Sequence, residues 1–164
     1  MAPVMLVVKE EEEAIAQILA LYPALRPIVR VDGHSAAGKS RVAKALVLAA
    51  GGRRLELDQF RAEGRRGEPY LTLGEQSELI VEISACLNEG RVCVLDGILL
   101  DQYVPLGMAE ELRIYVRSIT PTSHRESDKR RNRHLGTDRY HRSFLPHEKA
   151  HIFIEKRVPP DEWD

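Results

Sequence analysis

Short apolar runs alternate with longer stretches of helical periodicity along most of the chain. Runs of this length, rich in β-branched residues, are typical of strands buried in a sheet. The predicted strands are 28–31, 53–57, 92–95 and 112–116. Apolar residues three and four positions apart predict helices at 9–22, between Ser40 and Gly51, and at 75–89. Strands that alternate with helices are typical of an α/β fold, in which a parallel sheet carries helices on both faces.

The first predicted helix, residues 9–22, contains four consecutive glutamates at 10–13. Acidic side chains in a first turn are stabilised by the positive end of the helix dipole, so we interpret the glutamates as a solvated helix start. A metal-binding run is the alternative interpretation of the same carboxylates. The apolar residues of this helix share one face: Ile15, Ile18, Leu19 and Tyr22.

Composition favours a single folded domain that spans residues 1–164. The chain is 43% hydrophobic and 30% charged, and it lacks the run of about 18 apolar residues that a membrane span needs. No basic and then apolar signal pattern begins the chain, which favours the cytoplasm. Cys86 and Cys93 lack C-x-x-C spacing, so we expect reduced thiols. The net charge of −1 is no signal for a nucleic-acid partner.

A glycine-rich motif follows the strand predicted at 28–31. Residues 33–40, with the sequence GHSAAGKS, fit the pattern G-x-x-x-x-G-K-[ST] of a phosphate-binding loop. The two glycines let the loop N–H groups point inward at a phosphate, next to the positive end of a helix. Lys39 is expected to reach the β- and γ-phosphates and the Ser40 hydroxyl to bind Mg²⁺, whereas a glycine-rich turn without a ligand is the alternative. The residues expected to bind the nucleotide are Gly33, His34, Ser35, Ala36, Ala37, Gly38, Lys39, Ser40 and Arg41.

Two predicted strands are followed by an aspartate: Asp58 comes after the second strand and Asp96 after the third. Open α/β sheets place their ligands at the carboxyl ends of the strands. An apolar strand that ends in an acid is typical of the position that holds Mg²⁺ beside a phosphate-binding loop, so we expect Asp96 to join Ser40 in a metal site. An ordinary Asp-Gly turn is the alternative for Asp96, and a turn cap is the alternative for Asp58.

Arginines gather in two segments of the chain. Residues 59–73 form a predicted loop, and its Arg61, Arg65 and Arg66 either meet an anionic substrate or are only solvated. We interpret residues 120–142 as a lid whose arginines neutralise a moving γ-phosphate, with a solvated face or a nucleic-acid patch as the alternatives. The candidate catalytic arginines of this lid are Arg125, Arg130, Arg131 and Arg133.

Residues 147–151 spell H-E-x-x-H, the pattern with which zinc metalloproteases bind their metal. The extended form of that pattern needs a glycine and a histidine further on, but Ile154 and Arg157 stand at those places. Pro146 is expected at the first position of a helix, so we interpret the motif as an ordinary helix start and not as a protease site.

Four segments, taken in order, resemble the uridine-kinase-like group of small-molecule kinases that carry a phosphate-binding loop (P-loop). They are GHSAAGKS after IVRVD, then LDQF, then VCVLDGILL, and last LRIYV before the arginine-rich segment. The resemblance runs from Leu19 to Arg142 and implies an enzyme that uses ATP and Mg²⁺. In that family the aspartate that matches Asp58 is the general base for the acceptor hydroxyl. The acid that matches Asp96 is linked to Mg²⁺, and lid arginines clamp the phosphates.

The sequence departs from this family at several points. The family usually has Glu where Asp96 stands, and its longer acceptor-binding insertion with an Asp-His-Pro element is absent. Arg131 stands where the acid of an Arg-Asp pair in the lid would fall. The family would begin another strand where this sequence ends, at Asp164, so we expect a sheet of four to five strands.

We therefore expect a parallel α/β sheet of the P-loop nucleoside-triphosphate hydrolase and kinase type, with an arginine-rich lid. The expected activity is transfer of the γ-phosphate of ATP to a hydroxyl of a small molecule such as a nucleoside. An antibiotic, a sugar, a vitamin precursor or a nucleoside monophosphate is an alternative acceptor, and a non-catalytic nucleotide-binding protein is an alternative function. A regulatory GTPase would need an Asn-Lys-x-Asp motif, which the sequence lacks.

Overall fold

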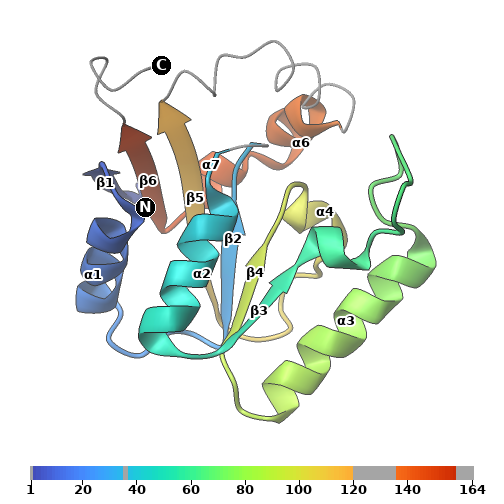
Figure 1. The fold of residues 1–164 in the computed structure, drawn as a ribbon, viewed down its shortest axis with the longest axis horizontal. Coiled ribbons are helices and arrows are strands. Elements are labelled where there is room, and N and C mark those ends of the chain that lie inside the picture. Colours follow the sequence, from blue (N-terminus) through green and yellow to red (C-terminus); the bar gives the residue numbers. More distant parts are fainter. Residues whose placement is uncertain (1, 35–36, 120–135, 158–164) are drawn as a thin grey trace.

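The structure, a computed structural model of the chain, describes residues 2–34, 37–119 and 136–157. These residues form a six-stranded sheet in which every pair of neighbouring strands is parallel (Figure 1). The strands lie in the order β1-β6-β5-β2-β4-β3, so β2, which leads into the phosphate-binding loop, is an interior strand. They are β1 (Val4–Val8), β2 (Ile28–Asp32), β3 (Arg53–Glu56), β4 (Cys93–Asp96), β5 (Glu111–Ile119) and β6 (Ile152–Arg157).

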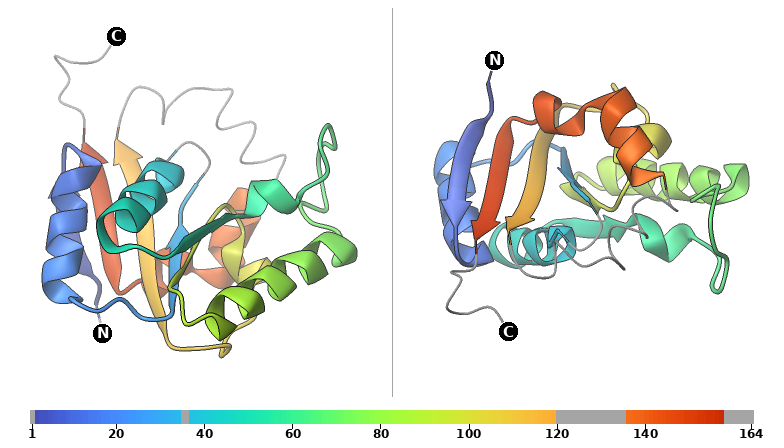
Figure 2. Two further views of the ribbon diagram at one scale, coloured as in Figure 1. Left: turned by 60° about the horizontal axis from the view of Figure 1, so that its bottom comes forward. Right: turned by 90° about the horizontal axis from the view of Figure 1, so that it is seen from above.

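Helices cover both faces of this sheet, as the alternation of strands and helices predicts. Apolar residues of α1 and α2 form one core with the sheet, and those of α3, α4 and α6 form a second core on the other face. Figure 2 shows α2 and α6 on opposite sides of the strands. The helices are α1 (Glu11–Leu21), α2 (Lys39–Ala50), the 3-10 helix η1 (Leu57–Phe60), α3 (Leu73–Asn88), α4 (Leu100–Tyr103), α6 (Thr137–Phe144) and α7 (Pro146–Lys149).

Alternation along the strands decides which side chains meet which helices. In β2, Ile28 belongs to the core beneath α3, whereas Val29 and Val31 belong to the core beneath α2. Successive side chains of a strand point to opposite faces, so Asp32 shares the α3 face with Ile28. By the same rule Asp96 of β4 shares the α2 face with Val94. Asp32 therefore lies on the face of the sheet that α3 covers, and Asp96 lies on the face that α2 covers.

The predicted number of strands is wrong, because the sheet has six strands and not four to five. The two strands that we did not predict, β1 and β6, pair with each other at the edge of the sheet. β1 is a continuous apolar run, VMLVV, but only Leu6 and Val8 are buried, so burial alternates along this edge strand. Its partner lies at the far end of the chain, and local periodicity carries no signal for such a pairing.

The predicted helices are confirmed, and local sequence explains where they begin and end. The leading helix at 9–22 is α1, and the helix at 75–89 is α3. Thr72 caps α3, because its hydroxyl accepts from the Glu75 N–H at 3.2 Å while the Glu75 carboxylate accepts from the Thr72 N–H at 2.8 Å. The predicted stop of α2 at Gly51 is also confirmed, with a φ of 81° that favours glycine.

The H-E-x-x-H segment does not form a zinc-binding helix. Helix α7 is four residues long with Pro146 at its start, as expected, and it ends before His151. His151 Nδ1 instead accepts from the Arg113 N–H of β5 at 2.9 Å. Among the described residues, one group of three acidic, histidine or cysteine side chains is close enough to share a metal ion: Glu10, Glu11 and Glu12. Lys156 pairs with Glu11 of this group. No helix within the described ranges is both long and apolar enough to cross a membrane.

Candidate active site

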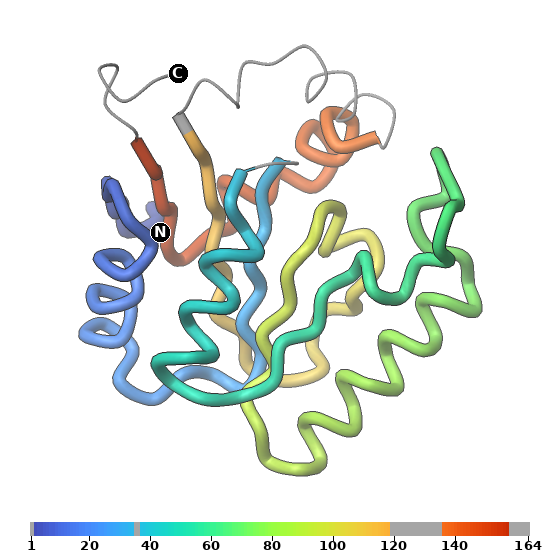
Figure 3. Tube along the Cα trace, viewed as in Figure 1, coloured from blue at the N-terminus to red at the C-terminus, as the bar shows by residue number. Residues whose placement is uncertain are grey.

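The phosphate-binding loop joins the carboxyl end of β2 to the amino end of α2, which lie side by side in Figure 3. Gly33 is required at the start of the loop, since a Cβ there would lie 2.4 Å from the carbonyl oxygen of Val116 in β5. Gly38 stands before α2 with a φ of 96°, and no side chain caps the helix. The amino end of a helix attracts anions through its dipole, so this end of α2 fits the phosphates of a nucleotide.

Lys39 lies folded over this loop. Its side chain is buried, and Nζ donates a hydrogen bond to the carbonyl oxygen of His34. The Ala37 N–H also donates to this oxygen at 3.2 Å, so the described part of the loop closes into a turn. This contact keeps the Lys39 ammonium group beside the loop, and its binding of a phosphate stays a prediction. Ser35 and Ala36, two further predicted ligands, lie outside the described residues.

Ser40 and Asp96 come from separate motifs and meet beside α2. The Ser40 hydroxyl lies 3.3 Å from Asp96 Oδ1, and the Asp96 side chain is 1% exposed. Adjacent ligands of an octahedral Mg²⁺ ion, each about 2.1 Å from the metal, lie about 3.0 Å apart. A hydroxyl and a carboxylate oxygen at this spacing fit the ion that the sequence predicts, and its binding here stays a prediction.

An arginine that the sequence analysis did not single out binds the same carboxylate. Arg54 of β3 places Nε 2.6 Å from Asp96 Oδ2 and Nη2 3.1 Å from Asp96 Oδ1. The alternation of residues 53–57 was a usable signal, because it places Arg54 and Glu56 on the face opposite Leu55 and Leu57. That face borders Asp96 only because β3 is the neighbour of β4.

Asp58 lies in η1, directly after β3, and is exposed. The preceding residue, Leu57, is fully buried, and a Cβ at Gly97 would lie 2.8 Å from the Leu57 Cβ. The turn that contains Asp58 therefore packs closely against Gly97, the residue that follows Asp96. This contact brings the predicted base and the predicted metal ligand to the same edge of the sheet.

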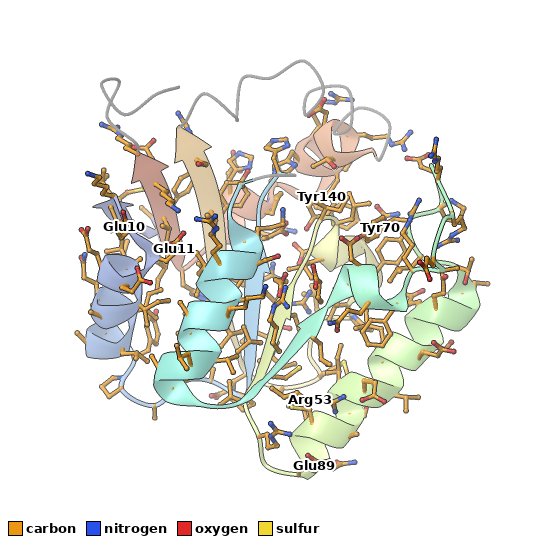
Figure 4. The ribbon with its side chains drawn as sticks, in the orientation of Figure 1. Glu10, Glu11, Arg53, Tyr70, Glu89 and Tyr140 are labelled. Atoms are coloured by element: carbon orange, nitrogen blue, oxygen red, sulfur yellow. The ribbon has the colours of Figure 1, made fainter. Side chains whose placement is uncertain are left out.

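A buried tyrosine that the sequence analysis missed orients the Asp58 carboxylate. The Tyr70 hydroxyl donates to Asp58 Oδ1, while the Tyr70 ring is 3% exposed and lies 4.9 Å from the Arg61 guanidinium carbon (Figure 4). One carboxylate oxygen is thus held by a fixed donor. The loop between η1 and α3 contains this tyrosine and gave no periodic signal in the sequence.

The loop arginines bind the loop itself. Arg61 donates to the carbonyl oxygens of Arg65, Gly67 and Tyr70 at distances between 2.8 and 3.3 Å. Arg65 also donates to the Tyr70 carbonyl oxygen at 2.6 Å and pairs with Glu75. These two guanidinium groups hold residues 61–72 in one shape, so their observed contacts are structural. Arg66 is exposed, which fits both a solvated arginine and one that meets an anionic substrate.

Asp32 links the phosphate-binding loop to α6, a contact that nothing in the sequence signalled. Its Oδ1 accepts from the Gly33 N–H at 2.8 Å, and its Oδ2 accepts from the Tyr140 hydroxyl. The Tyr140 oxygen in turn accepts from the Asp101 N–H at 3.0 Å. Burial raises the pKa of Asp32 to about 6, although the hydrogen bonds from Tyr140 and Gly33 oppose the shift. Figure 4 shows Tyr140 beneath α6.

Stacked imidazole rings form a second link between the loop and α6. The rings of His34 and His141 lie 3.7 Å apart and within 3° of parallel. Because His141 Nδ1 faces the Thr137 carbonyl oxygen at 2.8 Å, it carries the proton, and Nε2 accepts from the Tyr115 hydroxyl at 2.8 Å. Burial lowers the pKa of His141 to about 4, so the stack is neutral at pH 7.

The side chain of Arg41, a further predicted nucleotide ligand, does not reach the loop. Arg41 is exposed and its guanidinium lies 3.8 Å from Glu11 of α1, so it points toward that helix. The lid arginines Arg125, Arg130, Arg131 and Arg133 lie outside the described residues. Their role in a lid stays a prediction.

No protein-family model and no curated protein matches this sequence. The fold matches the solved structure of a possible uridine kinase from Bacillus stearothermophilus, with a TM-score of 0.54 and 15% sequence identity. The match covers 88% of this chain and 96% of that chain. A likeness at this identity concerns the fold, and it agrees with the resemblance drawn from the motifs. The chain is thus similar in fold to a possible uridine kinase, and its described residues form a parallel α/β sheet of six strands.

Proposed function

We propose that this protein is an ATP-dependent phosphotransferase that moves the γ-phosphate to a hydroxyl group of a small molecule. The observation that carries the proposal is the contact between Ser40 of the phosphate-binding loop and Asp96 at the end of β4, 3.3 Å apart. A glycine-rich turn that binds no ligand would not require a strand-end carboxylate such as Asp96 next to it. The likeness in fold to a possible uridine kinase supports the same function.

The proposed reaction assigns a role to each group at this edge of the sheet. The N–H groups at the start of α2 and the Lys39 ammonium bind the β- and γ-phosphates. Asp58 accepts the proton of the acceptor hydroxyl while the oxygen of that hydroxyl bonds to the γ-phosphorus. The bond between the γ-phosphorus and the β–γ bridging oxygen breaks, which releases ADP. Ser40 and Asp96 would hold a divalent cation, which would supply charge neutralisation to the phosphates.

The acceptor is an alcohol in this scheme. An alcohol needs a general base to remove its proton, and the Asp58 carboxylate can serve as that base. Nucleosides are the first acceptors to test, since the solved structure of similar fold is that of a possible uridine kinase. The chain lacks the insertion with which the uridine-kinase-like family binds its acceptor, so other alcohols also belong in the panel. Sugars, aminoglycosides and pantothenate are the next compounds to test.

The test is ADP release by the full chain with Mg²⁺ and ATP, measured against this panel of acceptors. Asp58→Asn should retain ATP binding and lower acceptor-dependent turnover at least about 100-fold, because it removes the proton acceptor. Glu63→Gln is the matched control, since Glu63 is an exposed carboxylate of the adjoining loop and its loss should leave turnover unchanged.

Two outcomes would contradict the proposal in different ways. Full turnover in Asp58→Asn would remove the assignment of the base while leaving a kinase. ATP binding without release of ADP for any acceptor would favour a non-catalytic nucleotide-binding protein, and absence of ATP binding would remove the assignment of the loop.

A further inference from the structure

Both oxygens of the Asp96 carboxylate are paired with one guanidinium group in this structure. Both oxygens accept from Arg54, at 2.6 Å and 3.1 Å, in the paired geometry that gives strong charge-assisted hydrogen bonds. The side chains are 1% exposed for Asp96 and 16% exposed for Arg54, so water screens the pair poorly. Arg54 is therefore a firm partner of the carboxylate that the proposed function assigns to a metal ion.

A divalent cation and this guanidinium compete for the same atoms. The oxygen nearest the Ser40 hydroxyl is Asp96 Oδ1, and it is the oxygen that accepts from Arg54 Nη2. The two lone pairs of this oxygen now accept from Ser40 and Arg54, so a metal ion bound to it would compete with both hydrogen bonds. Two cationic groups on one buried carboxylate also repel each other, so the cation can bind at Asp96 only as the guanidinium moves off.

Glu56 provides a second carboxylate to which Arg54 can move. Arg54 Nη2 already lies 3.2 Å from Glu56 Oε2, and Glu56 stands directly beside Asp96 in the pairing of β3 with β4. The Glu56 side chain is 26% exposed, so it is the more hydrated of the two acids. A small rotation of the Arg54 side chain can release Asp96 while the guanidinium keeps an anionic partner.

We propose that Arg54 is a displaceable counterion of Asp96, which holds the carboxylate in the metal-free protein and transfers to Glu56 when a divalent cation binds. Arg54 is then a positioning residue that sets the cation affinity of the site. The inference rests on the metal-binding role that the proposed function gives to Asp96. It does not depend on the identity of the acceptor or on turnover.

The experiment measures binding of Mn²⁺ alone to the full chain, by the electron paramagnetic resonance signal of the free ion. Asp96→Asn identifies the site. Mn²⁺ binding that this variant loses occurs at Asp96 and not at other acidic groups such as residues 10–12. Arg54→Gln should bind Mn²⁺ about tenfold more tightly at this site, the factor that corresponds to one charge-assisted hydrogen bond. Arg53→Gln is the matched control, since the neighbouring Arg53 pairs with Glu82 of α3 and should leave the affinity unchanged (Figure 4).

A second pair of variants separates displacement from simple damage to the site. Glu56→Gln removes the alternative partner and should weaken Mn²⁺ binding about tenfold, a change opposite in sign to that of Arg54→Gln. In the Arg54→Gln background, Glu56→Gln should change the Mn²⁺ affinity much less, because this background has no Arg54 guanidinium that must move to Glu56. Damage to the fold would weaken binding in all of these variants.

Each result either supports or overturns the inference. Mn²⁺ binding that appears or tightens in Arg54→Gln and disappears when Asp96→Asn is added supports it. Unchanged or weaker binding in Arg54→Gln overturns it, as does binding that Asp96→Asn leaves intact or an absence of binding in every variant. A failure of the proposed kinase function would appear instead in ATP binding and ADP release, which this titration does not involve.

Discussion

Replacing Tyr140 with phenylalanine should destabilise the protein more at pH 8 than at pH 5. The change removes the hydroxyl that donates to Asp32 Oδ2 and accepts from the Asp101 N–H, with little change in side-chain volume. The hydroxyl bonds to a buried carboxyl group whose pKa is raised by burial to about 6. Asp32 is therefore ionised at pH 8 and mostly protonated at pH 5.

The size of the effect follows from these two protonation states. At pH 8 the variant loses a hydrogen bond to a buried carboxylate, which costs about 1.5–3 kcal/mol, whereas at pH 5 it loses a bond to a neutral group, which costs about 0.5–1.5 kcal/mol. The lost bond from Asp101 adds the same amount at both pH values. The free energy of unfolding should therefore fall by about 1–2 kcal/mol more at pH 8 than at pH 5.

Linkage fixes the direction of the underlying pH dependence. The pKa of Asp32 rises from 3.8 to about 6 on folding, so between these values the folded state binds the proton and the unfolded state does not. The contribution of Asp32 to stability is therefore fully present below about pH 3.8 and is lost as the pH rises through about 6. Loss of the Tyr140 hydroxyl, which favours the ionised form, should move this pKa further upward.

Urea unfolding at the two pH values measures the prediction directly. Tyr22→Phe is the control, because Tyr22 lies at the end of α1 and its hydroxyl should contribute equally at both pH values. Equal losses of stability for Tyr140→Phe at pH 5 and pH 8 would refute the assignment of Asp32 as the titrating partner.

Two further predictions concern the loop and the proposed base. Gly33→Ala should cost more than about 3 kcal/mol in urea unfolding, because its Cβ would meet a backbone oxygen at 2.4 Å. A Cβ at Gly38 would meet no atom of the described residues within 4 Å, so Gly38→Ala should cost about 1–2 kcal/mol for a residue in the left-handed conformation. Equal losses for the two variants would contradict the close approach at Gly33. Tyr70→Phe should lower kcat about tenfold with an unchanged KM for ATP, since it frees the Asp58 carboxylate to turn. A raised KM for ATP with an unchanged kcat would show that Tyr70 acts on the nucleotide site instead.

The phosphate-binding loop could be predicted because its chemistry is local. Gly33, Gly38, Lys39 and Ser40 lie within eight residues, and their types meet backbone requirements that hold wherever the loop occurs. The helices α1, α2 and α3 were predictable for the same reason, since each segment by itself shows apolar residues with a period of 3.6. Asp96 was found because it ends a strand, a position that the apolar run before it marks.

The contacts around these residues were decided only by the tertiary structure. Arg54 reaches Asp96 because β3 lies beside β4, and Tyr140 reaches Asp32 although 108 residues separate them. β1 becomes a strand by pairing with β6 from the other end of the chain. A periodic pattern records which face of an element is apolar, but not which element will lie against it. The sequence by itself determined α1, α2, α3, the four strands β2 to β5 and the motif of the loop. The order of the strands decided which charged groups meet, because only packing brings distant residues within hydrogen-bond distance.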